Sequence, residues 1–137
     1  QSITGHSMGG HGALTLAVGL PGRFRSVSAF APICHPSNGD WGRKQLGAYL
    51  GPDSAEWAKH DATLMMRNVG LDIPLLVDTG ASDQFIDLLQ PEALAQAVMA
   101  RRLPATLRLQ KGYDHSYFFV STFMEDHISF HAEALYS

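Results

Sequence analysis

The sequence predicts an α/β fold in which about four parallel strands are flanked by helices. Two observations support this prediction. Short runs of strand type occur at Ser26 to Ile33, Ile73 to Thr79 and Ala105 to Gln110. Stretches with apolar residues at helical spacing lie between these runs. Strands that alternate with helices form parallel sheets, and such sheets bind their ligands at the carboxyl ends of the strands.

Two of the predicted helices have well-marked ends. The first follows an opening strand that ends at Ile3 and Thr4, and it runs from Gly9 to Gly19. The second begins at Pro91, because proline is favoured at the first helical position, and ends near Arg101, whose charge suits a helix C-terminus.

The sequence patterns of the remaining segments are less regular. The stretch from His35 to Gly51 is rich in Gly, Pro, Asn and Asp, so we expect a long loop, and long loops often carry function. Ser54 to Asn68 is expected to be one helix with Ser54 as its N-cap. A final helix is expected from Tyr117 to Leu135.

Composition limits the classes of protein that the chain can represent. Its 137 residues are 45% hydrophobic and 17% charged, which is typical of one soluble globular domain. The net charge of −3 and the absence of a cationic cluster larger than Arg101-Arg102 argue against a nucleic-acid partner. No apolar run approaches the roughly 20 residues that span a bilayer, so no membrane partner is expected. The single cysteine, Cys34, favours a reducing compartment, and we expect the cytoplasm.

The strongest chemical signal is a five-residue motif between the first strand and the first helix. Gly5-His6-Ser7-Met8-Gly9 matches G-x-S-x-G, the nucleophile elbow of the α/β-hydrolase fold. The strained turn presents the serine hydroxyl at the top of the sheet, and we expect both flanking glycines to be required because side chains there would clash. Ser7 is therefore the predicted nucleophile. The backbone N–H of Met8, at the start of the helix, is the predicted oxyanion donor.

A serine nucleophile needs a general base and a carboxylate that orients the base. In this fold the acid follows the serine in sequence, and the histidine follows the acid. Asp83 lies in the loop after the strand Ile73 to Thr79, so we prefer it over Asp78, which lies within the strand, and over Asp87, further along. His115 is the predicted base, because it alone follows a late strand in a loop with the acid behind it.

Other histidines and the cysteine allow simpler interpretations. His127 and His131 are four residues apart, which is a metal-ligand spacing, but no third ligand is suggested and we interpret them as a solvated helix face. His6 and His11 flank the elbow, where lining a substrate pocket and packing or capping are both compatible with the sequence. Cys34 is interpreted as a small core residue rather than a second nucleophile.

Several separate runs, in order, resemble one family. The chain resembles the S-formylglutathione hydrolase (esterase D) family over essentially its whole length. The runs that carry this resemblance are GHSMGGHGAL (Gly5 to Leu14), FAPICHP (Phe30 to Pro36), WGRKQLGAYLG (Trp41 to Gly51), DTGASDQF (Asp78 to Phe85) and YDHSYFF (Tyr113 to Phe119). The family's nucleophile, acid and base fall on Ser7, Asp83 and His115, the same three residues that fold order selects.

The resemblance implies a reaction and a substrate. It implies hydrolysis of S-formylglutathione to formate and glutathione, a step of formaldehyde detoxification, with side activity on short acyl esters. It also implies that the segment from Trp41 to Tyr49 borders the acyl and thiol sites, which makes Trp41 a pocket candidate, and that no metal or cofactor is needed. It is compatible with a homo-oligomer. His6 is a second pocket candidate because it flanks the elbow.

Two other functions remain open from the sequence, and so does the extent of the domain. A general short-chain carboxylesterase or a related acyltransferase would use the same triad, and a non-catalytic scaffold would bind a ligand without turnover. We expect residues 1–137 to be the C-terminal part of an α/β-hydrolase domain, with the N-terminal half of the fold upstream of residue 1. That half would supply the second oxyanion donor, so the chain alone is expected to be poorly active.

Overall fold

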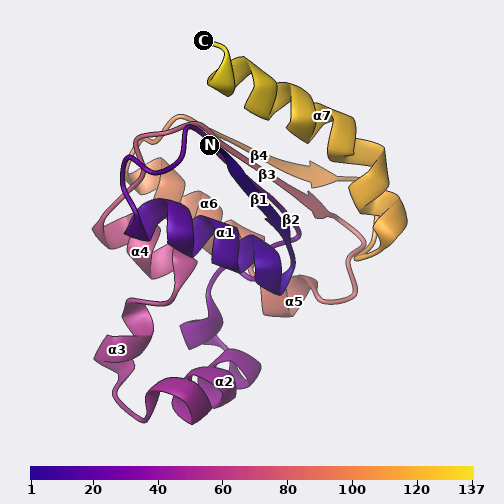
Figure 1. Cartoon of the computed structure of the whole chain (residues 1–137). Coiled ribbons are helices and arrows are strands. Elements are labelled where there is room, and N and C mark those ends of the chain that lie inside the picture. Colours follow the sequence, from indigo (N-terminus) through magenta and orange to yellow (C-terminus); the bar gives the residue numbers. More distant parts are fainter.

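The computed structural model describes the whole chain, residues 1–137 (Figure 1). Four strands alternate with helices, as the sequence predicts. In chain order the elements are β1 (Ile3–His6), α1 (Met8–Gly19), β2 (Val27–Phe30), the 3₁₀ helix η1 (Pro36–Asn38), α2 (Asp40–Leu50), α3 (Ser54–Ala58), α4 (Ala62–Asn68), β3 (Leu75–Gly80), α5 (Ile86–Leu89), α6 (Pro91–Ala100), β4 (Ala105–Gln110) and α7 (Tyr117–Leu135).

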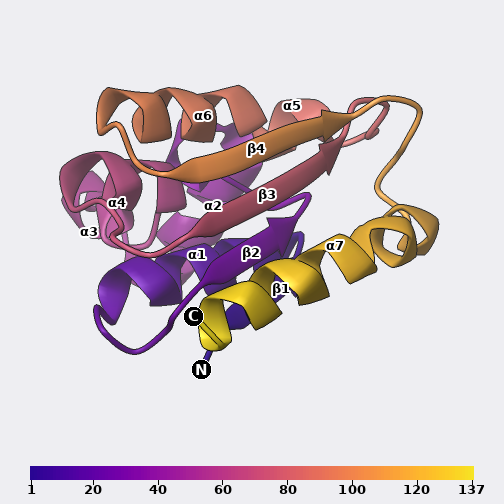
Figure 2. The same ribbon diagram turned by 90° about the horizontal axis from the view of Figure 1, so that it is seen from above.

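The four strands form one parallel sheet in the order β1-β2-β3-β4. One row of paired residues crosses all four strands: Ile3 pairs with Val27, Val27 with Leu75, and Leu75 with Ala105. The helices α1, α4 and α6, which connect successive strands, cover one face of the sheet, and α7 covers the other (Figure 1). Seen from above, α7 lies in front of the strands (Figure 2). All four strands therefore end at the same edge of the sheet.

The two faces of the sheet differ in chemistry because side chains alternate along each strand. The face toward α1, α4 and α6 is apolar and forms the main core. Its strand residues are Ile3, Val27, Ala29, Leu75, Val77, Ala105 and Leu107. The face toward α7 carries Ser28, Asp78 and Arg108, which are joined by hydrogen bonds directly or through the helix. A smaller apolar cluster, which includes Phe30 and Phe119, closes this side near the carboxyl edge.

Two expectations about the segment between β2 and β3 are wrong. The stretch from His35 to Gly51 is not a loop throughout, because α2 occupies most of it. The helix expected from Ser54 to Asn68 is broken in two. Asp53, not Ser54, caps α3, and Asp61 starts a new helix because its carboxylate accepts a hydrogen bond from the Leu64 N–H at 3.0 Å.

The final helix matches the expected bounds from Tyr117 to Leu135. No helix of the chain combines the length and the apolar character that a bilayer span requires.

Candidate active site

Ser7 lies in the sharp turn between β1 and α1, at the carboxyl edge of the sheet. Its backbone has φ 58° and ψ −117°, a conformation that a residue with a side chain rarely adopts. The turn is fixed on both sides, since the Ser7 N–H donates to the Phe30 carbonyl at 2.9 Å and the Ser7 carbonyl accepts from the His11 N–H at 3.0 Å. The motif therefore has the strained strand-turn-helix geometry of a nucleophile elbow.

The glycines of the motif have different roles. A Cβ on Gly5 would overlap the carbonyl of Gly9, so only glycine fits there. A Cβ on Gly9 would meet nothing within 4 Å, so the expectation that both motif glycines are sterically required is wrong for Gly9. The second tight position is Gly10, where a Cβ would lie 3.0 Å from Pro32 Cβ. The crowding arises where the first turn of α1 crosses the end of β1.

Replacement of Gly5 with alanine is expected to lower the free energy of unfolding by about 1–3 kcal/mol and to reduce hydrolysis, because the backbone of α1 must shift. Gly9→Ala is the matched control, and in α1 it should not destabilise the protein. Thermal melting and hydrolysis of p-nitrophenyl acetate by both variants would test this. Equal losses in the two variants would contradict the steric explanation.

Three side chains from distant parts of the chain meet at the turn. His115 Nε2 lies 3.0 Å from Ser7 Oγ, and His115 Nδ1 lies 2.7 Å from Asp83 Oδ2. Asp83 is 3% exposed, and its other oxygen accepts a hydrogen bond from the Phe85 N–H at 2.7 Å. Because a carboxylate only accepts hydrogen bonds, Nδ1 carries the proton and Nε2 of the neutral ring is free to accept from the serine hydroxyl.

The alternative acids lie elsewhere. Asp78 is buried on the α7 face, and Asp87 lies in the short helix α5. The geometry therefore brings together Ser7, Asp83 and His115, the three residues predicted from the sequence.

Two aromatic rings flank the imidazole of His115. The ring of His6 lies 4.8 Å from it between centroids, tilted by 31°, and the ring of Phe85 lies edge-on at 5.2 Å. Burial lowers the pKa of His6, and the neighbouring His115 lowers it further, while Asp83 acts in the opposite direction. His6 is thus favoured as a neutral ring beside the candidate base.

The N-terminus of α1 begins next to the candidate nucleophile. The backbone N–H of Met8 donates no hydrogen bond within the chain, as is usual for the first turn of a helix. This donor and the helix dipole favour negative charge near Ser7 Oγ.

A cavity of about 480 Å³ opens beside Met8, between α1 and α2. Trp41 and Tyr49 of α2 form one wall, and His11 of α1 forms part of the other. Of the two pocket candidates, Trp41 lines this cavity, whereas His6 lies against the ring of His115 instead.

The surroundings of His11 and Cys34 assign structural roles to both residues. His11 Nε2 accepts a hydrogen bond from the Ala62 N–H at 3.2 Å, so it helps to hold the start of α4. Burial lowers its pKa, which favours the neutral ring that this acceptor role needs. Cys34 is fully buried, and burial raises the pKa of its thiol far above the usual range, so it is a core residue rather than a nucleophile.

His127 and His131 do not form a solvated helix face, so that interpretation is wrong. His127 is 1% exposed, stacks on Phe30 and lies 2.7 Å from Asp78 Oδ2 through Nε2. Its Nδ1 lies 2.8 Å from Ser28 Oγ, which also contacts His131 Nε2 at 2.8 Å. The sheet beneath α7 is polar here, and the sequence signal was the spacing of Ser26, just before β2, and Ser28 within it.

The Ser28-His127-Asp78 array repeats the residue types of the site at Ser7, but it lacks access to substrate. All three residues are at most 1% exposed. The array therefore holds α7 on the sheet. No group of three or more His, Cys, Asp or Glu side chains in the chain is placed to bind a metal ion.

The fold and the site together define the class of the protein. The family model described as "Putative esterase" matches residues 1–130, and the chain belongs to this esterase family. Four parallel strands flanked by helices, the predicted fold class, are confirmed by this match and by the solved structures of esterases.

More specific similarity points to one enzyme. The chain is 66% identical over 135 residues to S-formylglutathione hydrolase of Paracoccus denitrificans and 49% identical over 137 residues to that of Rattus norvegicus. These matches cover 98% of this chain and 48% and 49% of the relatives. The solved structure of S-formylglutathione hydrolase from Agrobacterium tumefaciens superposes with a TM-score of 0.93 at 47% identity, over 98% of this chain and 49% of that one. The chain thus spans about half the length of the curated relatives it matches.

Proposed function

We propose that the chain carries the catalytic triad of an S-formylglutathione hydrolase, which converts S-formylglutathione to formate and glutathione. The observation that carries this proposal is the hydrogen-bonded series from Ser7 Oγ through His115 to the buried Asp83. The identity of 66% to a relative of that name supports the choice of substrate.

In the proposed acylation step, Ser7 Oγ attacks the formyl carbon while His115 Nε2 takes the hydroxyl proton. The carbon–sulfur bond then breaks, and His115 returns the proton to the departing glutathione sulfur. In deacylation, water attacks the formyl-enzyme and His115 takes a proton from the water. His115 then returns this proton to Ser7 Oγ as the bond between Oγ and the formyl carbon breaks, and the formic acid released ionises to formate. Asp83 stabilises the imidazolium in both steps and remains ionised. These steps use no metal or cofactor.

The proposed oxyanion donor within this chain is the backbone N–H of Met8. It belongs to the residue after the nucleophile, lacks an acceptor and lies at a helix N-terminus. In this fold the second donor comes from a loop that precedes the elbow strand in sequence, and the elbow strand is β1 here. We therefore propose that residues outside 1–137 complete the oxyanion hole.

The proposed substrate pocket is the cavity between α1 and α2. Its volume of about 480 Å³ is within the range of ligand sites, and it begins at Met8, next to the nucleophile. Trp41 would contact the substrate there, and His6 would border the reacting centre through its contact with the ring of His115. We place the reaction in the cytoplasm, which agrees with the single buried thiol of Cys34.

The substrate assignment is tested by comparing kcat/KM for S-formylglutathione and for p-nitrophenyl acetate in the full-length protein, which is also the protein used in the activity measurements below. We expect the thioester of glutathione to be preferred by at least about tenfold, because a fitted leaving group contributes binding energy to the transition state. A preference for the ester would indicate a general carboxylesterase. No turnover of either substrate, together with no reaction at Ser7, would indicate a non-catalytic scaffold.

A further inference from the structure

The wall of the cavity that carries Trp41 is held to the molecule at few points. The helix α2 lies away from the sheet (Figure 1), and Gly42 is its only buried residue. A Cβ on Gly42 would overlap the carbonyl of Pro36, so α2 packs closely against η1. Arg43 Nε also donates to the Ser37 carbonyl at 3.0 Å. The position of α2 therefore depends on the position of η1.

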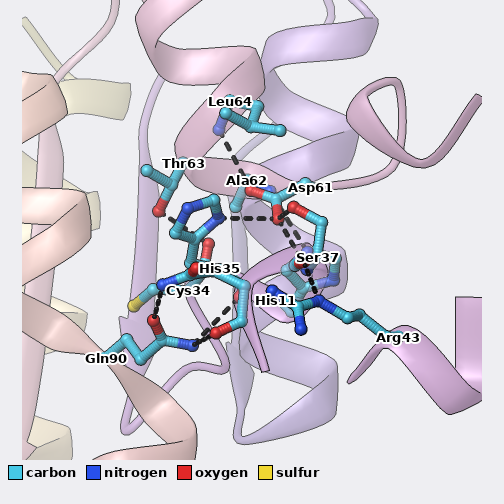
Figure 3. Close-up of polar contacts among 11 residues, drawn as sticks. His11, Cys34, His35, Ser37, Arg43, Asp61, Ala62, Thr63, Leu64 and Gln90 are labelled. Carbon is cyan, nitrogen blue, oxygen red and sulfur yellow. Dashed lines mark hydrogen bonds and ion pairs between the residues drawn. The ribbon is translucent and has the colours of Figure 1, made fainter. Parts of the chain in front are cut away.

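The short helix η1 is held by two side chains from distant parts of the chain (Figure 3). Gln90 donates to the His35 carbonyl at 3.0 Å and accepts from Asn38 Nδ2 at 2.9 Å. The other is Asp61, which contributes a buried carboxylate. Asp61 Oδ2 accepts hydrogen bonds from the Ser37 N–H at 3.0 Å, from the Ser37 hydroxyl at 2.7 Å and from His35 Nδ1 at 2.8 Å. Its other oxygen, Oδ1, accepts from the Leu64 N–H at 3.0 Å. Asp61 is 0% exposed, so these bonds replace its contact with water.

Asp61 itself is anchored in the core. It is the N-cap of α4, whose residues Ala62 and Met66 are fully buried. The N–H of Ala62 also donates to His11 Nε2, which ties this point to α1 behind the nucleophile. The carboxylate of Asp61 thus connects α1, on one side of the cavity, through η1 to α2, which forms the other wall.

Building on the proposed function, we propose that Asp61 is a positioning residue for substrate specificity. It does not line the cavity, but it holds η1 and α2 so that Trp41 and Tyr49 face α1 at the distance that a glutathione leaving group requires. It acts on the binding of the leaving group and not on the Ser7-His115-Asp83 chemistry.

The test compares two thioesters with the same formyl group, S-formylglutathione and S-formyl-2-mercaptoethanol. Asp61→Asn loses at least one bond, because the amide nitrogen must face either the Leu64 N–H or the donors of His35 and Ser37. We expect kcat/KM for S-formylglutathione to fall about tenfold, mainly through KM, and that for the small thioester to change less than about threefold.

Two further variants separate the contact of Asp61 with η1 from its role as the N-cap of α4. Ser37→Ala removes one bond to the carboxylate and keeps the α4 cap, so it should change the ratio of the two substrates in the same direction by a smaller factor. Asp53→Asn is the control, because Asp53 caps α3 from an exposed position without contacting η1. Equal losses on both thioesters in Asp61→Asn, an unchanged ratio, or the same change in Asp53→Asn would overturn the proposal.

Hydrogen exchange tests the role of Asp61 without any substrate, so its result does not depend on whether the protein hydrolyses S-formylglutathione. In Asp61→Asn the backbone amides of α2 should exchange hydrogen faster, while those of α6 should keep their wild-type rates. Unchanged exchange in α2 would overturn the proposal whatever the wild-type substrate is. Failure of the wild type to hydrolyse S-formylglutathione would instead refute the proposed function.

Discussion

Replacement of Ser7 with alanine is expected to lower kcat by about 10⁴- to 10⁶-fold, because the proposed reaction then has no group to form the acyl-enzyme. His115 and Asp83 would still be paired, so the loss comes from chemistry and not from the fold. The measurement is the rate of S-formylglutathione hydrolysis by wild type and variant, with thermal melting as a check on folding.

Ser28→Ala is the matched control for this prediction. Ser28 also contacts a histidine that is paired with an aspartate, but it is buried beneath α7. Its removal should lower stability and leave kcat of the folded protein within about threefold of wild type. A Ser7→Ala variant with more than a few per cent of wild-type kcat would contradict the assignment of the nucleophile.

The second large effect is expected at Asp78, on the face of the sheet that α7 covers. Asp78 is 0% exposed and pairs with Arg108 Nε at 2.6 Å, Arg108 Nη2 at 2.7 Å and His127 Nε2 at 2.7 Å. Asp78→Ala should lower the free energy of unfolding by about 3–5 kcal/mol, because it leaves buried donors without an acceptor. Urea unfolding would measure this.

Asp126→Ala provides the control for Asp78. Asp126 contacts the same arginine at 3.2 Å, but its side chain is 52% exposed. Its loss should cost less than about 1 kcal/mol. Equal free energies of unfolding for Asp78→Ala and Asp126→Ala would contradict the expectation that the buried ion pair with Arg108 contributes more than the exposed one.

The contribution of Asp78 should also depend on pH. Burial alone would raise its pKa, but hydrogen bonds from His127, Arg108 and Gln110 more than offset this and hold the pKa at about 2, below the ordinary 3.8. A lowered folded-state pKa means that the stabilisation is complete above about pH 5 and is lost as the pH falls toward 2. The difference in unfolding free energy between wild type and Asp78→Ala should therefore shrink over this range. A constant difference would contradict the ion-pair explanation.

The sequence was most informative where local pattern and chain order act together. The elbow at Ser7, the loop with Asp83 and the loop with His115 each follow a strand, and parallel strands bring such loops to one edge. The three residues meet in the structure for this reason. The ends of α7 could be predicted because it is long and has a serine N-cap, Ser116.

The features that the sequence did not reveal depend on contacts between distant segments. Nothing near His127 shows that Asp78 lies 49 residues earlier at hydrogen-bonding distance. Asp61 is expected within one continuous helix, but its carboxylate caps a new helix at the Leu64 N–H. Its buried contacts with His35 and Ser37 come from residues 26 and 24 positions earlier, which no local pattern shows. The tolerance at Gly9 also depends on what surrounds the turn rather than on the motif.

Reaction with a fluorophosphonate probe tests the central claim most directly, because the probe modifies a serine only where a base activates it. We expect one adduct per chain, located on Ser7 by tandem mass spectrometry, and no adduct in the Ser7→Ala variant. An adduct on another serine, such as Ser28, or no adduct on a folded protein, would contradict the assignment of Ser7 as the nucleophile.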